Sequence, residues 1–77
     1  MECEMKLEVR RRDIYSMEDP IKFTINIPVW NIHMLGSNEE DGFYWFDIIN
    51  ETNHTYYISK EDFIRVEAAI SHIEGVK

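Results

Sequence analysis

Side chains that could carry out catalysis are few in this sequence. Asp47 lies between two apolar residues, and Tyr57 is predicted opposite it on the next strand. A carboxylate in such surroundings can act as a general acid, but no second catalytic group is placed near it, and a charge in a strand also blocks wrong strand pairing. The sequence has no glycine-rich phosphate loop, nucleophile elbow, paired CxxC or HExxH motif. We therefore predict a structural role for Asp47, no catalytic residues, and a protein that is not an enzyme.

Metal-binding and redox residues are equally sparse. His33, His54 and His72 lie on different predicted elements and do not have the spacing of metal ligands. The acidic run at residues 39–41 lacks the alternate-residue spacing of a calcium loop. Cys3 is the only cysteine, so the chain cannot form an internal disulfide, which indicates a reducing compartment. We predict that the protein has no metal site and no cofactor.

The basic residues are concentrated in one run, Arg10, Arg11 and Arg12. Three adjacent arginines can bind phosphate, but Glu8 and Asp13 flank them and no aromatic residue is interleaved. We interpret the run as a solvated strand end with local ion pairs.

The formal net charge of −7 argues against direct binding of nucleic acid, which requires a basic surface. The negative charge either keeps the chain soluble or complements a basic surface on a protein partner, such as a surface that normally holds nucleic acid.

Most of the aromatic surface lies in one segment. The chain has four Phe, two Trp and four Tyr, and six of these ten residues fall between positions 43 and 57. Two runs rich in β-branched and aromatic residues, 43–49 and 55–58, flank a short polar segment, which is typical of a β-hairpin. We predict a three-residue loop with Asn53 in the left-handed region. The expected cross-strand pairs are Asn50–His54, Ile48–Tyr56 and Phe46–Ile58.

Strand alternation divides the side chains of this hairpin between two faces. One face carries no charge, and the other is mixed but strongly aromatic. The uncharged face consists of Tyr44, Phe46, Ile48, Tyr56 and Ile58. The mixed face consists of Phe43, Trp45, Asp47, Ile49, Thr55, Tyr57 and Ser59.

Strands are also predicted before the hairpin. Apolar and polar residues alternate over residues 4–9 and 21–27, and again, in a changed phase, over residues 29–35. The last segment is either a third strand or the second strand continued after a bulge. Turn-forming residues predict a connection at 16–20 and a flexible acidic loop at 36–42.

A helix is predicted after the hairpin, between Ser59, a good N-cap, and Gly75, which can end it. Its apolar stripe at helical spacing consists of Phe63, Val66, Ile70 and Ile73. The predicted fold class is therefore α+β, a single domain over residues 1–77 with an antiparallel sheet of four to five strands and one C-terminal helix packed on one face. We expect the helix to cover the uncharged face.

One helix covers only one face of a sheet, which leaves the aromatic face to be explained. A chain of 77 residues gains roughly 3–5 kcal/mol from its core and is marginal as a monomer. Self-association as a homodimer, or a protein partner, is the expected source of further stability. No run approaches the ~20 apolar residues of a membrane span, and the first residues do not form a secretory signal, so we predict a cytoplasmic protein with no membrane contact.

The function that these features favour is a non-enzymatic protein-binding module that inhibits or regulates a partner. Small acidic accessory proteins of phages and mobile elements, and antitoxin-like or immunity-like inhibitors, are analogous in size and charge only. Alternatively, a strongly bent sheet could bury the aromatic face within the same chain, and no binding surface would then remain there. The expected contact residues are Phe43, Trp45, Tyr57 and Trp30, with Glu39, Glu40 and Asp41 steering association.

A second hypothesis is a protein that binds a small ligand. Trp30, Trp45, Tyr44 and Tyr57 would then line a pocket between sheet and helix, or across a dimer seam. Such a pocket could stack on a planar ligand such as a nucleotide base. The negative net charge disfavours a phosphate group, although the arginine run offsets it locally.

Overall fold

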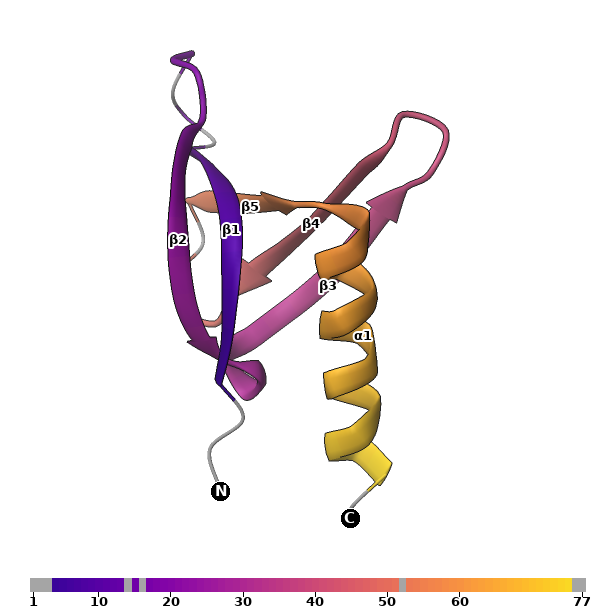
Figure 1. The fold of residues 1–77 in the computed structure, drawn as a ribbon. Coiled ribbons are helices and arrows are strands. Elements are labelled where there is room, and N and C mark those ends of the chain that lie inside the picture. The colour runs from indigo at the N-terminus through magenta and orange to yellow at the C-terminus, as the bar shows by residue number, and fades with distance from the viewer. Residues whose placement is uncertain (1–3, 14, 16, 52, 76–77) are drawn as a thin grey trace.

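A five-stranded antiparallel sheet and one C-terminal helix make up the fold, as the sequence predicts (Figure 1). The computed structural model describes residues 4–13, 15, 17–51 and 53–75, with side chains as far as residue 71. Cys3 and the side chains of His72 and Ile73 lie outside the described part. The strand order is β2-β1-β5-β4-β3. The elements are β1 (Glu4–Asp13), β2 (Ile21–Pro28), the 3-10 helix η1 (Val29–Asn31), β3 (Ile32–Asn38), β4 (Phe43–Ile48), β5 (His54–Ile58) and α1 (Lys60–Gly75).

Strand β1 is longer than predicted, because it continues through the arginine run. Arg10 pairs with Tyr57 and Arg11 with Tyr56 of β5, so these residues join the two halves of the sheet. Alternation continues across the run, and the Arg11 guanidinium lies 5.4 Å from the ring centroid of Phe23. The predicted local ion pairs are wrong, since none of the ion pairs among the described residues involves these arginines.

Strand β2 matches its prediction, lies at one edge of the sheet and ends at Pro28, and both positions tolerate proline. The strand predicted over residues 29–35 is wrong in its first part. Residues 29–31 form η1, and a register shift falls between Ile32 and Met34 of β3. This irregularity places Leu35, rather than Met34, against the core, and Met34 remains 59% exposed.

The acidic loop is shorter than predicted. Residues 36–38 belong to β3, where Gly36 pairs with Trp45 and Asn38 with Phe43. The connection is a closed turn over residues 39–42, in which the Gly42 N–H donates to the Glu39 carbonyl at 3.3 Å. Gly42 has a φ of 72°, a conformation that glycine adopts without strain.

The β4–β5 hairpin forms with a register two residues from the predicted one. Phe46 pairs with Tyr56, and Tyr44 with Ile58. The predicted three-residue loop is wrong, because Asn50 (φ 70°), and not Asn53, adopts the left-handed conformation. The Ile49 N–H donates to the Asn31 carbonyl at 2.7 Å, which draws the end of β4 toward η1 and away from β5. A shift of two residues keeps every side chain on its face, so the predicted faces are unaffected.

The core lies between the uncharged face and the helix. All five residues predicted for that face are buried, together with Leu7, Val9 and Ile27, and Phe46 is 0% exposed. Helix α1 contributes its predicted stripe, with Val66 buried and Phe63 and Ile70 packed against the cluster. No helix in the described part of the chain is long and apolar enough to cross a membrane.

The helix begins as predicted. The Ser59 Oγ accepts a hydrogen bond from the Asp62 N–H at 3.2 Å, and the Ser59 carbonyl accepts one from the Phe63 N–H at 2.9 Å. This N-cap satisfies two backbone donors of the first turn. Ser59 follows β5 directly, so the cap fixes the point at which the chain turns from the sheet onto its covered face.

Candidate functional site

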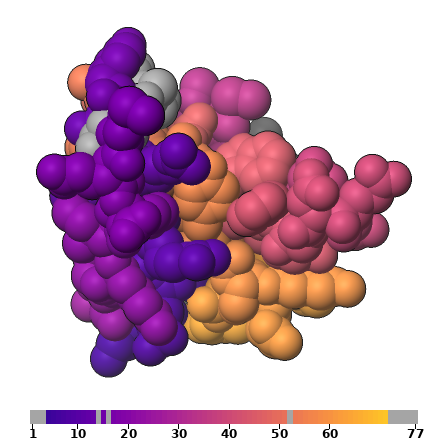
Figure 2. All heavy atoms as spheres, turned by 90° about the horizontal axis from the view of Figure 1, so that it is seen from above, coloured from indigo at the N-terminus to yellow at the C-terminus, as the bar shows by residue number. Residues whose placement is uncertain are grey.

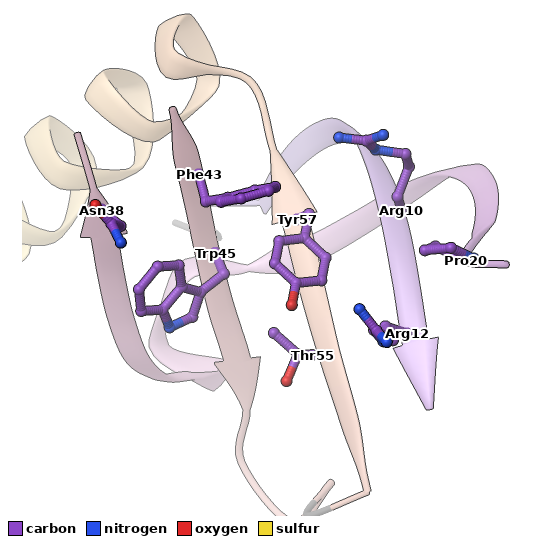
Figure 3. Close-up of a pocket in the computed structure, with 8 residues that line it drawn as sticks. All are labelled: Arg10, Arg12, Pro20, Asn38, Phe43, Trp45, Thr55 and Tyr57. Atoms are coloured by element: carbon purple, nitrogen blue, oxygen red, sulfur yellow. The ribbon is translucent and has the colours of Figure 1, made fainter. Parts of the chain in front are cut away.

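The face of the sheet opposite the helix holds a depression of about 490 Å³ (Figure 3). It crosses the sheet from β3 to the start of β2, and β4, β5 and β1 form its floor. We call its aromatic and arginine residues, Arg10, Arg12, Phe43, Trp45 and Tyr57, the open face. The depression is lined by Arg10, Arg12, Pro20, Asn38, Phe43, Trp45, Thr55 and Tyr57.

The three aromatic rings of the open face lie together. The Phe43 and Tyr57 rings meet edge to face with their centroids 6.0 Å apart. Trp45 pairs with Tyr57 across the strands, and its indole extends from β4 toward β3 (Figure 3). Phe43 is 49% exposed, while Trp45 and Tyr57 are half-buried. These rings therefore form an apolar surface that water still reaches.

Gly36 makes room for the indole of Trp45. A Cβ atom at this position would lie 2.6 Å from the ring carbons Cε2 and Cζ2 and 2.7 Å from Nε1. Only a residue without a side chain lets the indole pack so closely against the backbone of β3. The orientation of Trp45 is thus set by its cross-strand neighbour.

Two arginines border the aromatic rings. Arg10 and Arg12 alternate with Arg11 along β1, so both side chains project on the open face. Lys22 of β2 is paired with Arg10, which adds a third positive charge on this side of the sheet. The ion pairs found among the described residues include neither Arg10 nor Arg12. Their guanidinium groups can therefore bind carboxylates from another molecule.

The predicted acidic residues lie at the end of the β3–β4 hairpin. Glu39, Glu40 and Asp41 are all exposed. The Asn38 Nδ2 donates to Asp41 Oδ2 at 2.9 Å, which holds the turn in place. The strand residues next to this turn, Asn38 and Phe43, both line the depression. The negative charges therefore lie beside the aromatic surface, on the side away from the arginines.

The structure brings together three of the four predicted aromatic contact residues. Phe43, Trp45 and Tyr57 share the depression, but Trp30 lies in η1, which contacts α1, and does not line it. Tyr44, predicted to line a ligand pocket between sheet and helix, is part of the core, and it also borders a separate depression of about 410 Å³ that Tyr57 and the first residues of α1 line.

Sequence reasoning missed Arg10 and Arg12 as members of this face, because the run was interpreted as a strand end. Extending the alternation of β1 by four residues would have placed them there.

Asp47 does not face Tyr57, since Tyr57 pairs with Trp45 and Asp47 with Met34. The sequence placed Asp47 opposite Tyr57 because the predicted register of the hairpin was wrong. Asp47 lines a further depression, of about 410 Å³, with exposed Met34 and Ile49 among its other residues. In the part of the chain that the structure covers, no three His, Cys, Asp or Glu side chains lie close enough to bind a metal ion.

A polar cluster closes the β4–β5 loop. The Tyr56 hydroxyl donates to Glu51 Oε1 at 2.6 Å, and the same oxygen lies 3.3 Å from His54 Nδ1. Burial, followed by the hydrogen bond and the negative charge of Glu51, raises the pKa of Tyr56 to about 12. The Tyr56 ring stacks on Phe46 at 5.3 Å, so this cluster belongs to the covered side of the sheet. It ties the loop to the core.

Comparison of the chain with protein-family models, with curated proteins and with solved structures gives no match. The candidate residues of the open face are therefore identified by their geometry and chemistry alone.

Proposed function

We propose that the protein is a non-enzymatic protein-binding module and that the open face is its binding site. The observation that carries the proposal is the convergence of Phe43, Trp45 and Tyr57 with two arginines on the face that α1 does not cover. Trp, Tyr and Arg are the residue types that contribute most to binding energy at protein interfaces. By occupying a surface of its partner, the module would inhibit or regulate that partner.

The partner that fits this face presents carboxylates beside an apolar side chain. Arg10 and Arg12 form bidentate hydrogen bonds with carboxylates, while Trp45 and Tyr57 pack against the apolar group. A basic group of the partner would be repelled where it meets Arg10 and Arg12. A protein is favoured over a nucleic acid because exposed Met34 and the carboxylate of Asp47 continue the face along β3 and β4.

Selection from a displayed library of random peptides tests this proposal. We expect the immobilised protein to enrich peptides in which Asp or Glu lies close to an aromatic or aliphatic residue. Trp45→Ala should lower the affinity for the selected peptides by about 30-fold, as expected for an interface residue that contributes about 2 kcal/mol to the binding free energy. The helical circular dichroism signal should not change, because Trp45 lies outside the core cluster.

Trp30→Ala is the matched control, since Trp30 is 50% exposed and lies outside the depression. Its affinity for the same peptides should equal that of the native chain. Failure to enrich any sequence class, or an equal loss in both tryptophan variants, would contradict the proposal.

A small planar anion is the second candidate, favoured by the size of the depression and by its arginines. Titration of tryptophan fluorescence with AMP and ATP separates the two functions. Saturable quenching that Trp45→Ala abolishes and Trp30→Ala retains would support the ligand. An unchanged signal up to millimolar nucleotide would reject it.

A further inference from the structure

On the side of the sheet opposite the helix, the strand residues of β1 and β2 are mainly basic, whereas the β3–β4 turn is acidic. Four basic strand residues of β1 and β2 lie on the same side of the sheet as the open face, namely Lys6, Arg10, Arg12 and Lys22. Two acidic strand residues, Glu4 and Glu8, lie on that side with them. The β3–β4 hairpin ends in Glu39, Glu40 and Asp41, with no basic residue in its turn. The two hairpins diverge on either side of β5 (Figure 1), and the view from above shows their atoms separated by those of β5 (Figure 2).

We propose that a second copy of this chain binds the open face, in a two-fold symmetric dimer in which each acidic turn meets the basic side of the other copy. This inference rests on the proposed function, because it names the partner of the same site. A two-fold axis that lies between the two facing sheets, inclined to β5 and passing close to Trp45, brings each acidic turn over Arg10 and Arg12 of the other copy. Every contact between an acidic turn and the arginines is then made twice, as in an isologous interface.

The aromatic rings lie at the centre of such a dimer. Trp45 lies close to this axis and would pack against Trp45 of the other copy, with Tyr57 and Phe43 of both copies beside it. Burial of the exposed surface of Phe43 in this way adds apolar stabilisation at about 25 cal/mol per Å². A single domain of 77 residues gains more from such burial than a larger one, because its own core is small.

Charge complementarity acts at contact distance in this dimer. Each copy has a net charge of −7, and two copies repel each other at long range. At physiological ionic strength this repulsion is screened beyond about 8 Å, whereas carboxylate and guanidinium groups in contact are screened much less. The pairing of acidic turn with arginines therefore decides the relative orientation of the two copies.

Two charge-reversal variants test the dimer by sedimentation velocity over a micromolar to millimolar dilution series. The first is Arg10→Glu with Arg12→Glu. The second is Glu39→Lys with Glu40→Lys, which leaves Asp41 to hold the turn through Asn38. We expect the native chain to sediment as a species of twice 9.3 kDa. The dissociation constant of the dimer should rise at least about tenfold in each variant alone, because both symmetric contacts become repulsive.

An equimolar mixture of the two variants should restore the dimer. In the mixed pair, the new glutamates of one chain face the new lysines of the other, and the native arginines face the native acidic turn. Glu61→Lys with Glu67→Lys, on exposed positions of α1, changes the net charge by the same amount as the second variant. This control should leave the dimer unchanged or stronger. Circular dichroism of each variant confirms that it is folded.

A native chain that remains monomeric at the highest concentration would overturn the dimer, as would a mixture that stays monomeric while both variants are folded. Neither outcome bears on the proposed function itself. If a monomeric chain still selects acidic peptides in a Trp45-dependent way, the face binds another protein and only the identity of the partner is wrong.

Discussion

Each face of the β4–β5 hairpin carries three aromatic rings, and the two sets have different surroundings. On the covered face, Phe46 is completely buried and its ring stacks on Tyr56 with an interplanar angle of 9°. On the open face, Phe43 meets Tyr57 at 60° and remains half exposed. Aromatic content alone therefore does not determine which face forms the core.

The neighbouring strand determines the difference. Residues of β1 on the covered side include Leu7 and Val9, both 1% exposed, which extend the apolar surface of the hairpin, and Arg11, whose guanidinium lies over the Phe23 ring. Residues on the other side are charged, and they end at Arg10 and Arg12 beside the rings. A face becomes the core when adjacent strands continue its apolar surface. The face that meets charged residues remains available to another molecule.

The largest contrast is expected from truncating one ring on each face. Phe46→Ala removes a ring with no exposed surface and should destabilise the fold by about 3–5 kcal/mol, which is comparable to the whole stability of a domain of this size. Phe43→Ala should cost less than about 1 kcal/mol, since half of its surface is already in water. Urea unfolding of both variants measures this contrast, and equal losses would show that the open face is also core.

The covered face has a pH dependence that can be measured at Tyr56. The pKa of Tyr56 is raised to about 12, above its ordinary value of 10.0, so the folded state favours the neutral phenol. The associated stability, of the order of 2–3 kcal/mol, is fully present below pH ~10 and is lost as the pH rises from about 10 to about 12.

Denaturant unfolding at about pH 9 and about pH 11 checks this dependence. The difference in stability between the native chain and Tyr56→Phe should shrink at the higher pH, because the phenylalanine variant cannot ionise there. A difference that does not change with pH would show that Tyr56 ionises as it does in the unfolded chain.

A substitution at Gly36 tests the open face alone, because this position contacts the Trp45 ring of that face. Gly36→Ala places a methyl group 2.6 Å from the Trp45 ring and forces the indole to move, at a cost of about 1–3 kcal/mol. In a Trp45→Ala background the same substitution should cost almost nothing, since the clash is absent. A double-mutant cycle of unfolding free energies measures this coupling, and a cost that persists without the indole would refute it.

The smallest effect is expected at the junction between the sheet and the helix. Ser59→Ala removes the oxygen that accepts from the Asp62 N–H and should cost about 1 kcal/mol of stability. Ser59→Asp keeps an acceptor and should restore most of that loss. Thermal unfolding followed at the helical signal measures both variants, and a destabilised aspartate variant would contradict the capping role.

Local patterns predicted most of the fold. Alternation and the helical stripe identify the two faces, the capped helix and the covered side, because these depend on side-chain periods of 2 and 3.6 residues. The hairpin register could not be predicted, because the hydrogen bond from Ile49 to Asn31 joins segments far apart in the sequence. The same holds for β3, whose start is set by η1 packing beside α1.

The candidate site was predicted in part for a similar reason. Phe43, Trp45 and Tyr57 belong to one hairpin, so their alternation placed them on a common face. Arg10 and Arg12 reach the same depression only through the pairing of β1 with β5. A pairing between strands more than 40 residues apart leaves no periodic signal in either segment.

That pairing also has a kinetic consequence. Four residue pairs, from Arg10–Tyr57 to Asp13–His54, hold the N-terminal hairpin to the rest of the sheet. The β1–β2 and β3–β4 hairpins each close short loops and can form early, whereas this pairing must close a loop of more than 40 residues. Such closure is slow compared with hairpin formation. The rate-limiting event in folding is therefore expected at this narrow seam between β1 and β5. The same pairing completes the depression, so the depression forms only in the last step of folding.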